Sequence, residues 1–226
     1  MRHFKLLTTF GLALALQFSA VSTAQAGTTS SLQVSKKRAA RKRSHPIFSG
    51  YLVRDDQLRT EPLPRPSGKL KLYSVNFHET LEVELYDEQG MLREDSLDAL
   101  NHFWRCRRTG TEKPINPHLF EVLSIIQDHF EGRTIELVSG FRNQERTTSY
   151  HFHGSASDIK VAGVSDRELH KFVSTLDTGN MGLGLYPRAG FIHVDVRPDS
   201  YRWVDWSPPG NDMGHPKKSR KRARTS

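Results

Sequence analysis

Charge is the feature that most strongly limits which part of this chain can fold. Of the 33 lysines and arginines, two lie in residues 1–26, six in residues 36–43 and six in residues 217–224. The other 19 lie between Ser44 and Pro216 together with all 25 acidic residues, so this central part is net −6 although the whole chain is +8. Runs of like charge repel one another and are normally disordered. The folded part must therefore lie between the two basic runs.

The first 26 residues have the layout of a secretory signal peptide. A short start with Arg2 and Lys5 precedes a largely apolar stretch at residues 6–22, and Ala24-Gln25-Ala26 matches the small-x-small cleavage pattern. The alternative is a membrane anchor, but the stretch contains several polar residues and is short against the roughly 20 apolar residues of a membrane span. We expect cleavage after Ala26 and an exported protein in the periplasm or cell envelope.

The cysteine content limits how an exported chain can be stabilised. Cys106 is the only cysteine, so the chain can form no internal disulfide and must rely on its core or on a metal ion. We interpret Cys106 as a small buried apolar side chain rather than a reactive thiol.

Composition divides the rest of the chain. Residues 27–69 are predicted to form a basic, proline-containing and largely disordered linker. Residues 70–206 are predicted to form the folded domain, a zinc peptidase-like domain by the resemblance given below, and residues 207–226 a basic disordered tail. A folded part of this length is a normal size for one domain with its own core.

Hydrophobic periodicity predicts an α+β fold with helices packed on a mainly antiparallel sheet. Asn116 before Pro117, and Ser165 three residues before Glu168, are helix-start patterns. Alternation of apolar and polar residues predicts two hairpins and two further strands. The predicted hairpins are 70–77 with 80–87 and 181–187 with 190–196, the strands are 134–140 and 156–161, and the helices are 96–106, 116–130 and 165–176.

Polar side chains on two of these strands suggest a metal site. His193 and Asp195 are two residues apart on a predicted strand and therefore face the same side. Asp158 lies on another predicted strand, seven residues after His151. Two imidazoles and one carboxylate, with a fourth position for water, form the ligand set of catalytic zinc, which lowers the pKa of bound water to about 7. With 11 histidines in the chain, spacing alone does not establish such a site.

Two longer motifs carry a family resemblance. The segments LVSGFRNQERTTSYHFHGSASDIKV and MGLGLYPRAGFIHVDVR resemble the LAS superfamily of zinc peptidases, which includes lysostaphin, the D-Ala-D-Ala metallopeptidases and the hedgehog-like fold, and within it the YcbK-like murein endopeptidases. The resemblance covers roughly residues 70–206 and implies a hedgehog/DD-peptidase-like fold. The matching positions are Ser139, Gly140, Phe141, Arg142, Ser149, His151, Gly154, Ala156, Asp158, Tyr186, Pro187, His193 and Asp195.

The resemblance also implies roles for these residues. His151, Asp158 and His193 would be the ligands of Zn²⁺. Arg142 would orient the peptide or stabilise the developing oxyanion, with a structural salt bridge as the alternative. His153 competes with His151 as a ligand, but the spacing to Asp158 favours His151.

The general base is where the chain departs from the family pattern. Several relatives carry a glutamate three residues before the last histidine, and this chain has Gly190 there. Asp195 is the candidate for the base, or for a residue that only orients an imidazole.

The function implied by the resemblance is zinc-dependent hydrolysis of peptide bonds in peptidoglycan cross-links, with stem peptides as the substrate. The sequence does not distinguish D,D from L,D bonds, an endopeptidase from a carboxypeptidase, or one oligomeric state from another. A non-catalytic wall-binding module stabilised by metal, and an adaptor that docks a protein partner, are the alternatives. The basic tails suit anionic wall polymer or lipid, and no nucleic-acid partner is expected for an exported protein.

Overall fold

The computed structural model describes residues 46–143 and 145–209. The expected signal peptide and both basic runs lie outside the described residues. Within the described part of the chain, no helix has the length and apolar character needed to cross a bilayer.

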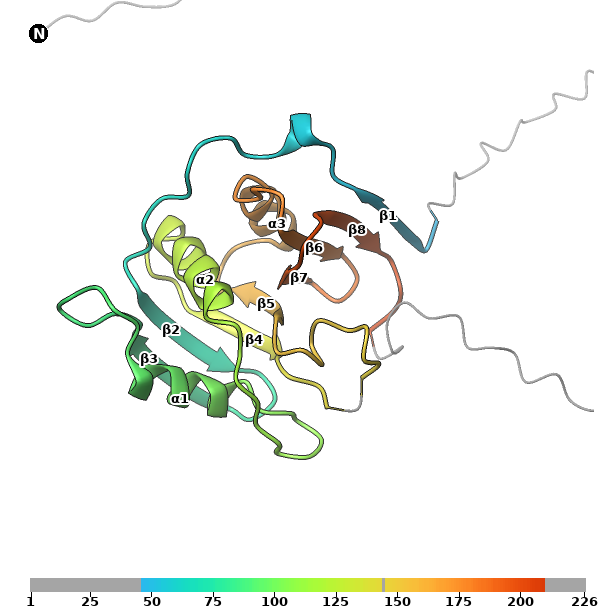
Figure 1. Cartoon of the computed structure of the whole chain (residues 1–226). Helices are drawn as coiled ribbons and strands as arrows, with labels where there is room; N and C mark the ends of the chain where they lie inside the picture. The colour runs from blue at the N-terminus through green and yellow to red at the C-terminus, as the bar shows by residue number, and fades with distance from the viewer. Residues whose placement is uncertain (1–45, 144, 210–226) are drawn as a thin grey trace, which may run out of the picture. The chain divides into compact units, whose positions relative to one another are not determined.

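One eight-stranded sheet organises the described residues. Its order is β1-β8-β6-β7-β5-β4-β2-β3, which runs in Figure 1 from the upper right to the lower left. Five neighbouring pairs are antiparallel, and the pairs β2–β4 and β6–β8 are parallel. The strands are β1 Phe48–Leu52, β2 Lys69–Ser74, β3 Glu79–Glu84, β4 Ile135–Ser139, β5 Ala156–Val161, β6 Met181–Tyr186, β7 Phe191–Val196 and β8 Tyr201–Asp205.

Within residues 46–143 and 145–209, three α-helices accompany the sheet, and two of them begin as the sequence predicts. They are α1 Glu94–Phe103, α2 Pro117–His129 and α3 Asp166–Ser174. The Asn116 side chain accepts a hydrogen bond from the backbone of His118 at the start of α2, and the Ser165 side chain accepts one from Glu168 at the start of α3. The predicted α+β class, with helices on a mainly antiparallel sheet, is confirmed.

The main core lies between the helices and one face of the sheet. It is built from alternate strand residues and from the apolar faces of the three helices. The opposite face of the sheet carries the polar groups together with a smaller buried cluster of Tyr186, Phe191 and Trp203. Central members, all buried, are Leu72, Leu100, Trp104, Phe120, Leu123, Ile126, Ile135, Ile159, Leu169, Val173, Leu183 and Ile192. Cys106 is buried at the edge of this core, as expected, with its Sγ 3.2 Å from Asn143 Oδ1.

Two strands were not predicted from the sequence. β1 lies inside the stretch that we assigned to the linker, and it pairs along its length with β8. All five β1 residues are exposed, so the segment lacks the alternation of buried and exposed positions by which a strand is recognised. Its place in the sheet depends on backbone pairing with β8, a partner about 150 residues away in the chain, which no local pattern can indicate.

Candidate metal centre

The candidate site is built on the face of the sheet opposite the main core. Asp158 on β5 lies directly across from His193 on β7. His193 is in turn opposite Gly184 on β6, and Gly184 is opposite Trp203 on β8. Directly paired residues of neighbouring strands have side chains on the same face. The two predicted ligands therefore meet because of strand register, although they are 35 residues apart in the chain.

A β-bulge at the end of β4 completes this row. Leu137 pairs with Ile159 and faces the core, and the register then shifts so that Ser139 pairs with Asp158. Bulges re-aim side chains and are common beside functional sites. Here the bulge brings Ser139 and the following residues of the Ser-Gly-Phe-Arg motif alongside Asp158.

His151 reaches the site from the loop between β4 and β5. Its Nδ1 is 2.7 Å from the carbonyl oxygen of Gly140. The close packing of this loop depends on Gly154, which has a positive φ of 70° and whose added Cβ would lie 2.7 Å from the carbonyl oxygen of Pro114. The small residues between His151 and Asp158 therefore allow a tight return of the chain into β5.

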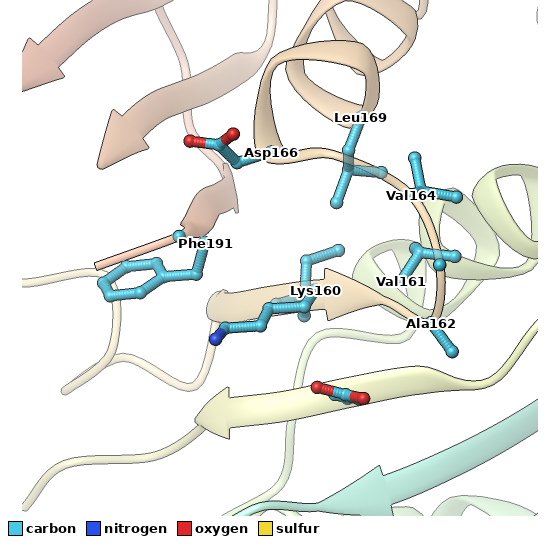
Figure 2. Close-up of a pocket in the computed structure, with 11 residues that line it drawn as sticks. Lys160, Val161, Ala162, Val164, Asp166, Leu169 and Phe191 are labelled. Carbon is cyan, nitrogen blue, oxygen red and sulfur yellow. The ribbon is translucent and has the colours of Figure 1, made fainter. Parts of the chain in front are cut away.

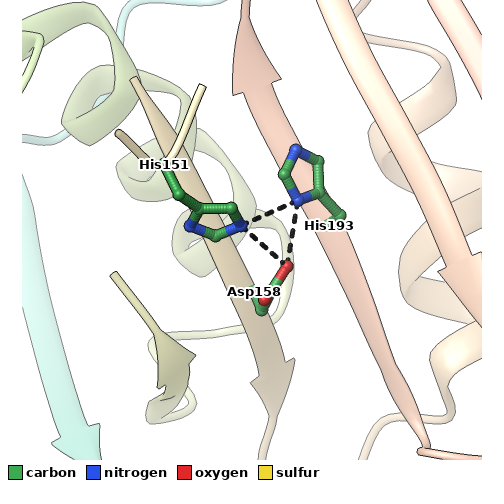
Figure 3. A group of neighbouring side chains, drawn as sticks. All are labelled: His151, Asp158 and His193. Carbon is green, nitrogen blue, oxygen red and sulfur yellow. Dashed lines mark hydrogen bonds and ion pairs between the residues drawn. The ribbon is translucent and has the colours of Figure 1, made fainter. Parts of the chain in front are cut away.

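The three predicted ligands converge in the structure (Figure 3). His193 Nδ1 is 2.9 Å from Asp158 Oδ1, and His151 Nε2 is 3.3 Å from the same oxygen and 3.1 Å from His193 Nδ1. All three side chains are buried, and among the described residues they form the one cluster of histidine, cysteine and acidic groups with the spacing to hold a metal ion.

Hydrogen bonds to Gly140 and Asp195, which lie outside this cluster, fix which nitrogen of each imidazole faces it. A carbonyl oxygen only accepts, so His151 donates from Nδ1 to Gly140, and its Nε2 faces Asp158. His193 donates from Nε2 to a carboxylate oxygen of Asp195 at 2.7 Å, and its Nδ1 faces Asp158. In the neutral rings the inward nitrogens carry the lone pairs. Two such nitrogens and a carboxylate oxygen fit a zinc ion in number and chemistry.

Arg142 holds the outer oxygen of Asp158. Its Nη2 donates to Asp158 Oδ2, and its Nε donates to Ser139 Oγ at 2.7 Å. Burial by itself would raise the pKa of Asp158, but its interactions with His151, with the Arg142 guanidinium and with His193 hold that pKa well below its usual range. The carboxylate is therefore ionised, as a metal ligand must be.

Asp195 stands behind His193, on the side away from Asp158. Both of its oxygens are engaged by Arg197, which donates from Nε at 2.7 Å to Oδ1 and from Nη2 to Oδ2. Burial would raise the pKa of Asp195, but the hydrogen bonds from Arg197 and His193 lower it. Burial would likewise lower the pKa of His193, but the two carboxylates beside it raise it.

Two neighbours of the site, Arg197 and Trp203, were not predicted from the sequence. Arg197 lies on the continuation of β7, and its guanidinium carbon is 4.5 Å from the centre of the Tyr150 ring. The signal was present, because the two-residue spacing of His193 and Asp195 continues to Arg197. Trp203, with its ring 5.0 Å from that of His193, had no such signal. It fits there because a Cβ on Gly184 would lie 2.3 Å from the indole ring.

The remaining sequence candidates lie elsewhere. His153 is exposed and donates from Nε2 to the carbonyl oxygen of Thr147, so the structure brings His151 rather than His153 to the cluster. Gly190 lies in the turn between β6 and β7 and carries no group that could accept a proton.

Comparison with known proteins gives the family. A family model of the M15 peptidases, described as Peptidoglycan L,D-endopeptidase MepK, matches residues 64–203, more than half of the chain. The chain belongs to this peptidase family. Membership confirms the resemblance to the YcbK-like group of the LAS superfamily, and the matched region contains all three residues of the candidate metal centre.

Individual members of the MepK family are similar over much of their length. The chain is 32% identical to the Peptidoglycan L,D-endopeptidase MepK of Escherichia coli (strain K12) over 148 residues, which cover 60% of this chain and 79% of the relative. It is 31% identical to the probable peptidoglycan L,D-endopeptidase MepK of Haemophilus influenzae over 116 residues, or 45% of this chain and 61% of the relative. A search of solved structures found no match.

Proposed function

We propose that this protein is an exported zinc peptidase that hydrolyses peptide bonds in peptidoglycan cross-links. The observation that carries the proposal is the buried cluster of His151, Asp158 and His193 in a chain of the MepK family. The relatives are named L,D-endopeptidases, which favours L,D bonds over D,D bonds.

Within this proposal His151, Asp158 and His193 hold the zinc ion. Zinc bound there would supply Lewis-acid chemistry toward the scissile amide carbonyl. Arg142 acts mainly by positioning Asp158, since its Nη2 is committed to that carboxylate and its Nε to Ser139. This role corresponds to the salt-bridge alternative rather than to direct stabilisation of an oxyanion.

Asp195 is proposed to position His193 rather than to act as the general base. Its contact is to His193 Nε2, the nitrogen that faces away from Asp158, and Arg197 occupies both of its oxygens. A carboxylate in this position fixes the tautomer and ring orientation of a metal-binding histidine.

The proposed compartment follows from the sequence. The expected signal peptide would deliver the protein to the side of the membrane where peptidoglycan lies, in the periplasm or cell envelope. The two basic runs would hold the acidic central part close to anionic wall polymer or lipid. Deleting residues 217–224 should then reduce the fraction of protein that sediments with purified cell wall.

Digestion of purified murein tests the proposed activity. The zinc-loaded protein should release muropeptides whose masses identify the bond that is cut, and a chelator should stop the release, which added zinc should restore. Release that continues without metal would contradict the zinc assignment. Protein that binds murein and zinc but never cleaves would instead support the wall-binding module.

Replacing Asp195 by asparagine is expected to weaken zinc binding by roughly 10–100-fold, the usual cost of losing an outer partner of a metal ligand. The amide cannot accept from both His193 and Arg197 as the carboxylate does. Competition with a chromogenic chelator measures the change. Asp199→Asn, an exposed site, is the matched control, and equal affinities in the two variants would argue against the positioning role.

A further inference from the structure

Three glycines on the metal-bearing face of the sheet are each covered by a side chain that lies down on the backbone. A Cβ added to any of the three would collide with that side chain, and the pairs are Gly184 with Trp203, Gly182 with Arg197 and Gly50 with Tyr201. None of the three glycines has the positive φ that would require glycine, so close approach is the reason for them. The sheet is therefore low and flat on the side of the metal centre that leads to β8 and β1.

This flat area extends from the metal centre to the edge of the sheet. Direct pairing across β7, β6, β8 and β1 forms one row, made of His193, Gly184, Trp203 and Gly50. Phe48 and Leu52 occupy alternate positions of β1 around Gly50, so they face the same side, and they are 47% and 66% exposed. β1 is the outermost strand beyond β8 (Figure 1). Together with the half-buried Tyr201 ring these two side chains form an apolar surface, which we call the edge shelf.

The edge shelf has the polarity of a surface that binds a sugar ring. Its two charged neighbours are already engaged, because Arg197 donates to Asp195 and Asp205 accepts from the backbone of Ser207. The Tyr201 hydroxyl, in contrast, makes no hydrogen bond with any of the residues that the structure describes. A pyranose ring packs its C–H face on an aromatic ring, and its hydroxyl groups bond to polar groups at the edge of that ring. The shelf therefore suits a neutral sugar better than a charged peptide.

The distance between the edge shelf and the metal centre corresponds to a short peptide. Neighbouring strands lie about 4.8 Å apart, so β8 is roughly 10 Å and β1 roughly 14 Å from β7. An extended chain spans about 3.3 Å per residue, so a group on the shelf lies about three or four residues from a peptide bond at the metal centre. In murein each stem peptide is attached to an amino sugar of a glycan strand. A sugar is therefore within reach of the shelf when a cross-link lies at the metal centre.

The other opening near the metal centre lies on different strands. A cavity of about 200 Å³ opens where β5 and β7 separate (Figure 2). Its lining includes Lys160 of β5, Phe191 of β7 and Asp166 at the start of α3. The edge shelf lies on β8 and β1, which β6 separates from β7. A sugar on the shelf would therefore leave this cavity open.

We propose that the edge shelf binds a sugar of the glycan strand to which the cut peptide is attached. The Tyr201 ring stacks on the sugar, its hydroxyl bonds to a sugar hydroxyl, and Phe48 and Leu52 pack beside them. The inference rests on the proposed peptidase function and adds to it recognition of the polysaccharide part of murein. The protein then selects cross-linked peptides that are still attached to glycan over free peptides.

Two matched substrates test the edge shelf. One is a cross-linked muropeptide dimer that carries its amino sugars, and its twin is the same peptide after an amidase has removed the sugars. Zinc-loaded full-length protein should cleave the sugar-bearing dimer with a kcat/KM at least about 10-fold higher, mainly through a lower KM. Tyr201→Leu, and the double variant Phe48→Ser with Leu52→Ser, should each remove most of this preference with little change toward the sugar-free twin.

The matched control is Met91→Ser, because Met91 is 67% exposed, as Leu52 is, but lies between β3 and α1. It should keep the preference of the wild type. Unchanged preference in both shelf variants would overturn the proposal.

Binding to peptide-free glycan strands separates this inference from the proposed peptidase function. Tryptophan fluorescence in the presence of a chelator follows the binding without cleavage. Binding that both shelf variants lose, in a protein that cleaves neither substrate, would support the edge shelf and contradict the proposed function. Variants that lose binding to lipid vesicles but bind glycan as the wild type does would overturn the assignment of a sugar.

Discussion

Asp158→Asn is expected to lower murein hydrolysis by at least about 1000-fold. Loss of a residue that hydrogen-bonds to a metal ligand lowers metal affinity or activity roughly 10–100-fold, and loss of a direct ligand should lower them more. The change removes the negative charge that His151, His193 and Arg142 all face. It therefore removes the buried ionic partner of the Arg142 guanidinium and leaves a weaker donor toward zinc.

The measurement is the rate of muropeptide release together with the zinc content after dialysis. Asp98→Asn, an exposed aspartate of α1, should keep both properties of the wild type. If Asp158→Asn retained zinc and activity while folding normally, the assignment of the three ligands would be wrong.

Much of the fold was predictable because the main elements carry local signals. The apolar faces of α2 and α3 reflect which side of each helix is buried, and the helix starts at Asn116 and Ser165 reflect capping hydrogen bonds. The alternation along β5 and β7 separates the apolar residues that face the main core from the polar residues of the candidate site. β1 and β8 were missed because they are held by pairing with distant strands, and the exposed face of β1 shows no alternation.

The residues of the candidate site also fall into those with a local sequence signal and those that depend on long-range strand pairing. The ligands could be identified because a two-residue spacing places side chains on one face and because the motif resembles a known family. The residues that contact and position these ligands could not all be predicted. Trp203 reaches His193 only because β6 and β8 are parallel neighbours and Gly184 leaves space for the ring. That Arg142 binds Asp158 rather than open solvent depends on the bulge at Ser139.

Trp104→Ala should lower the free energy of unfolding by about 3–5 kcal/mol, the range for removing a large aromatic side chain from a core. The indole is fully buried and packs edge-on against Phe120, with ring centres 5.1 Å apart. Its Nε1 also donates to Ser157 Oγ at 2.8 Å. Urea denaturation in the presence of a chelator measures the loss without a contribution from bound metal. Phe48→Ala, on exposed β1, should change stability by less than about 0.5 kcal/mol.

Trp104 also connects the core to the metal centre, and Trp104→Phe separates the two effects. The indole partner Ser157 precedes Asp158, and the Trp104 carbonyl oxygen accepts from the backbone of Phe141, which precedes Arg142. Phenylalanine keeps most of the packing but leaves the buried Ser157 hydroxyl without its donor, at a cost of about 1–3 kcal/mol. We expect zinc affinity to fall in Trp104→Phe because β5 loses a contact beside Asp158. Unchanged zinc affinity would mean that strand pairing alone positions Asp158.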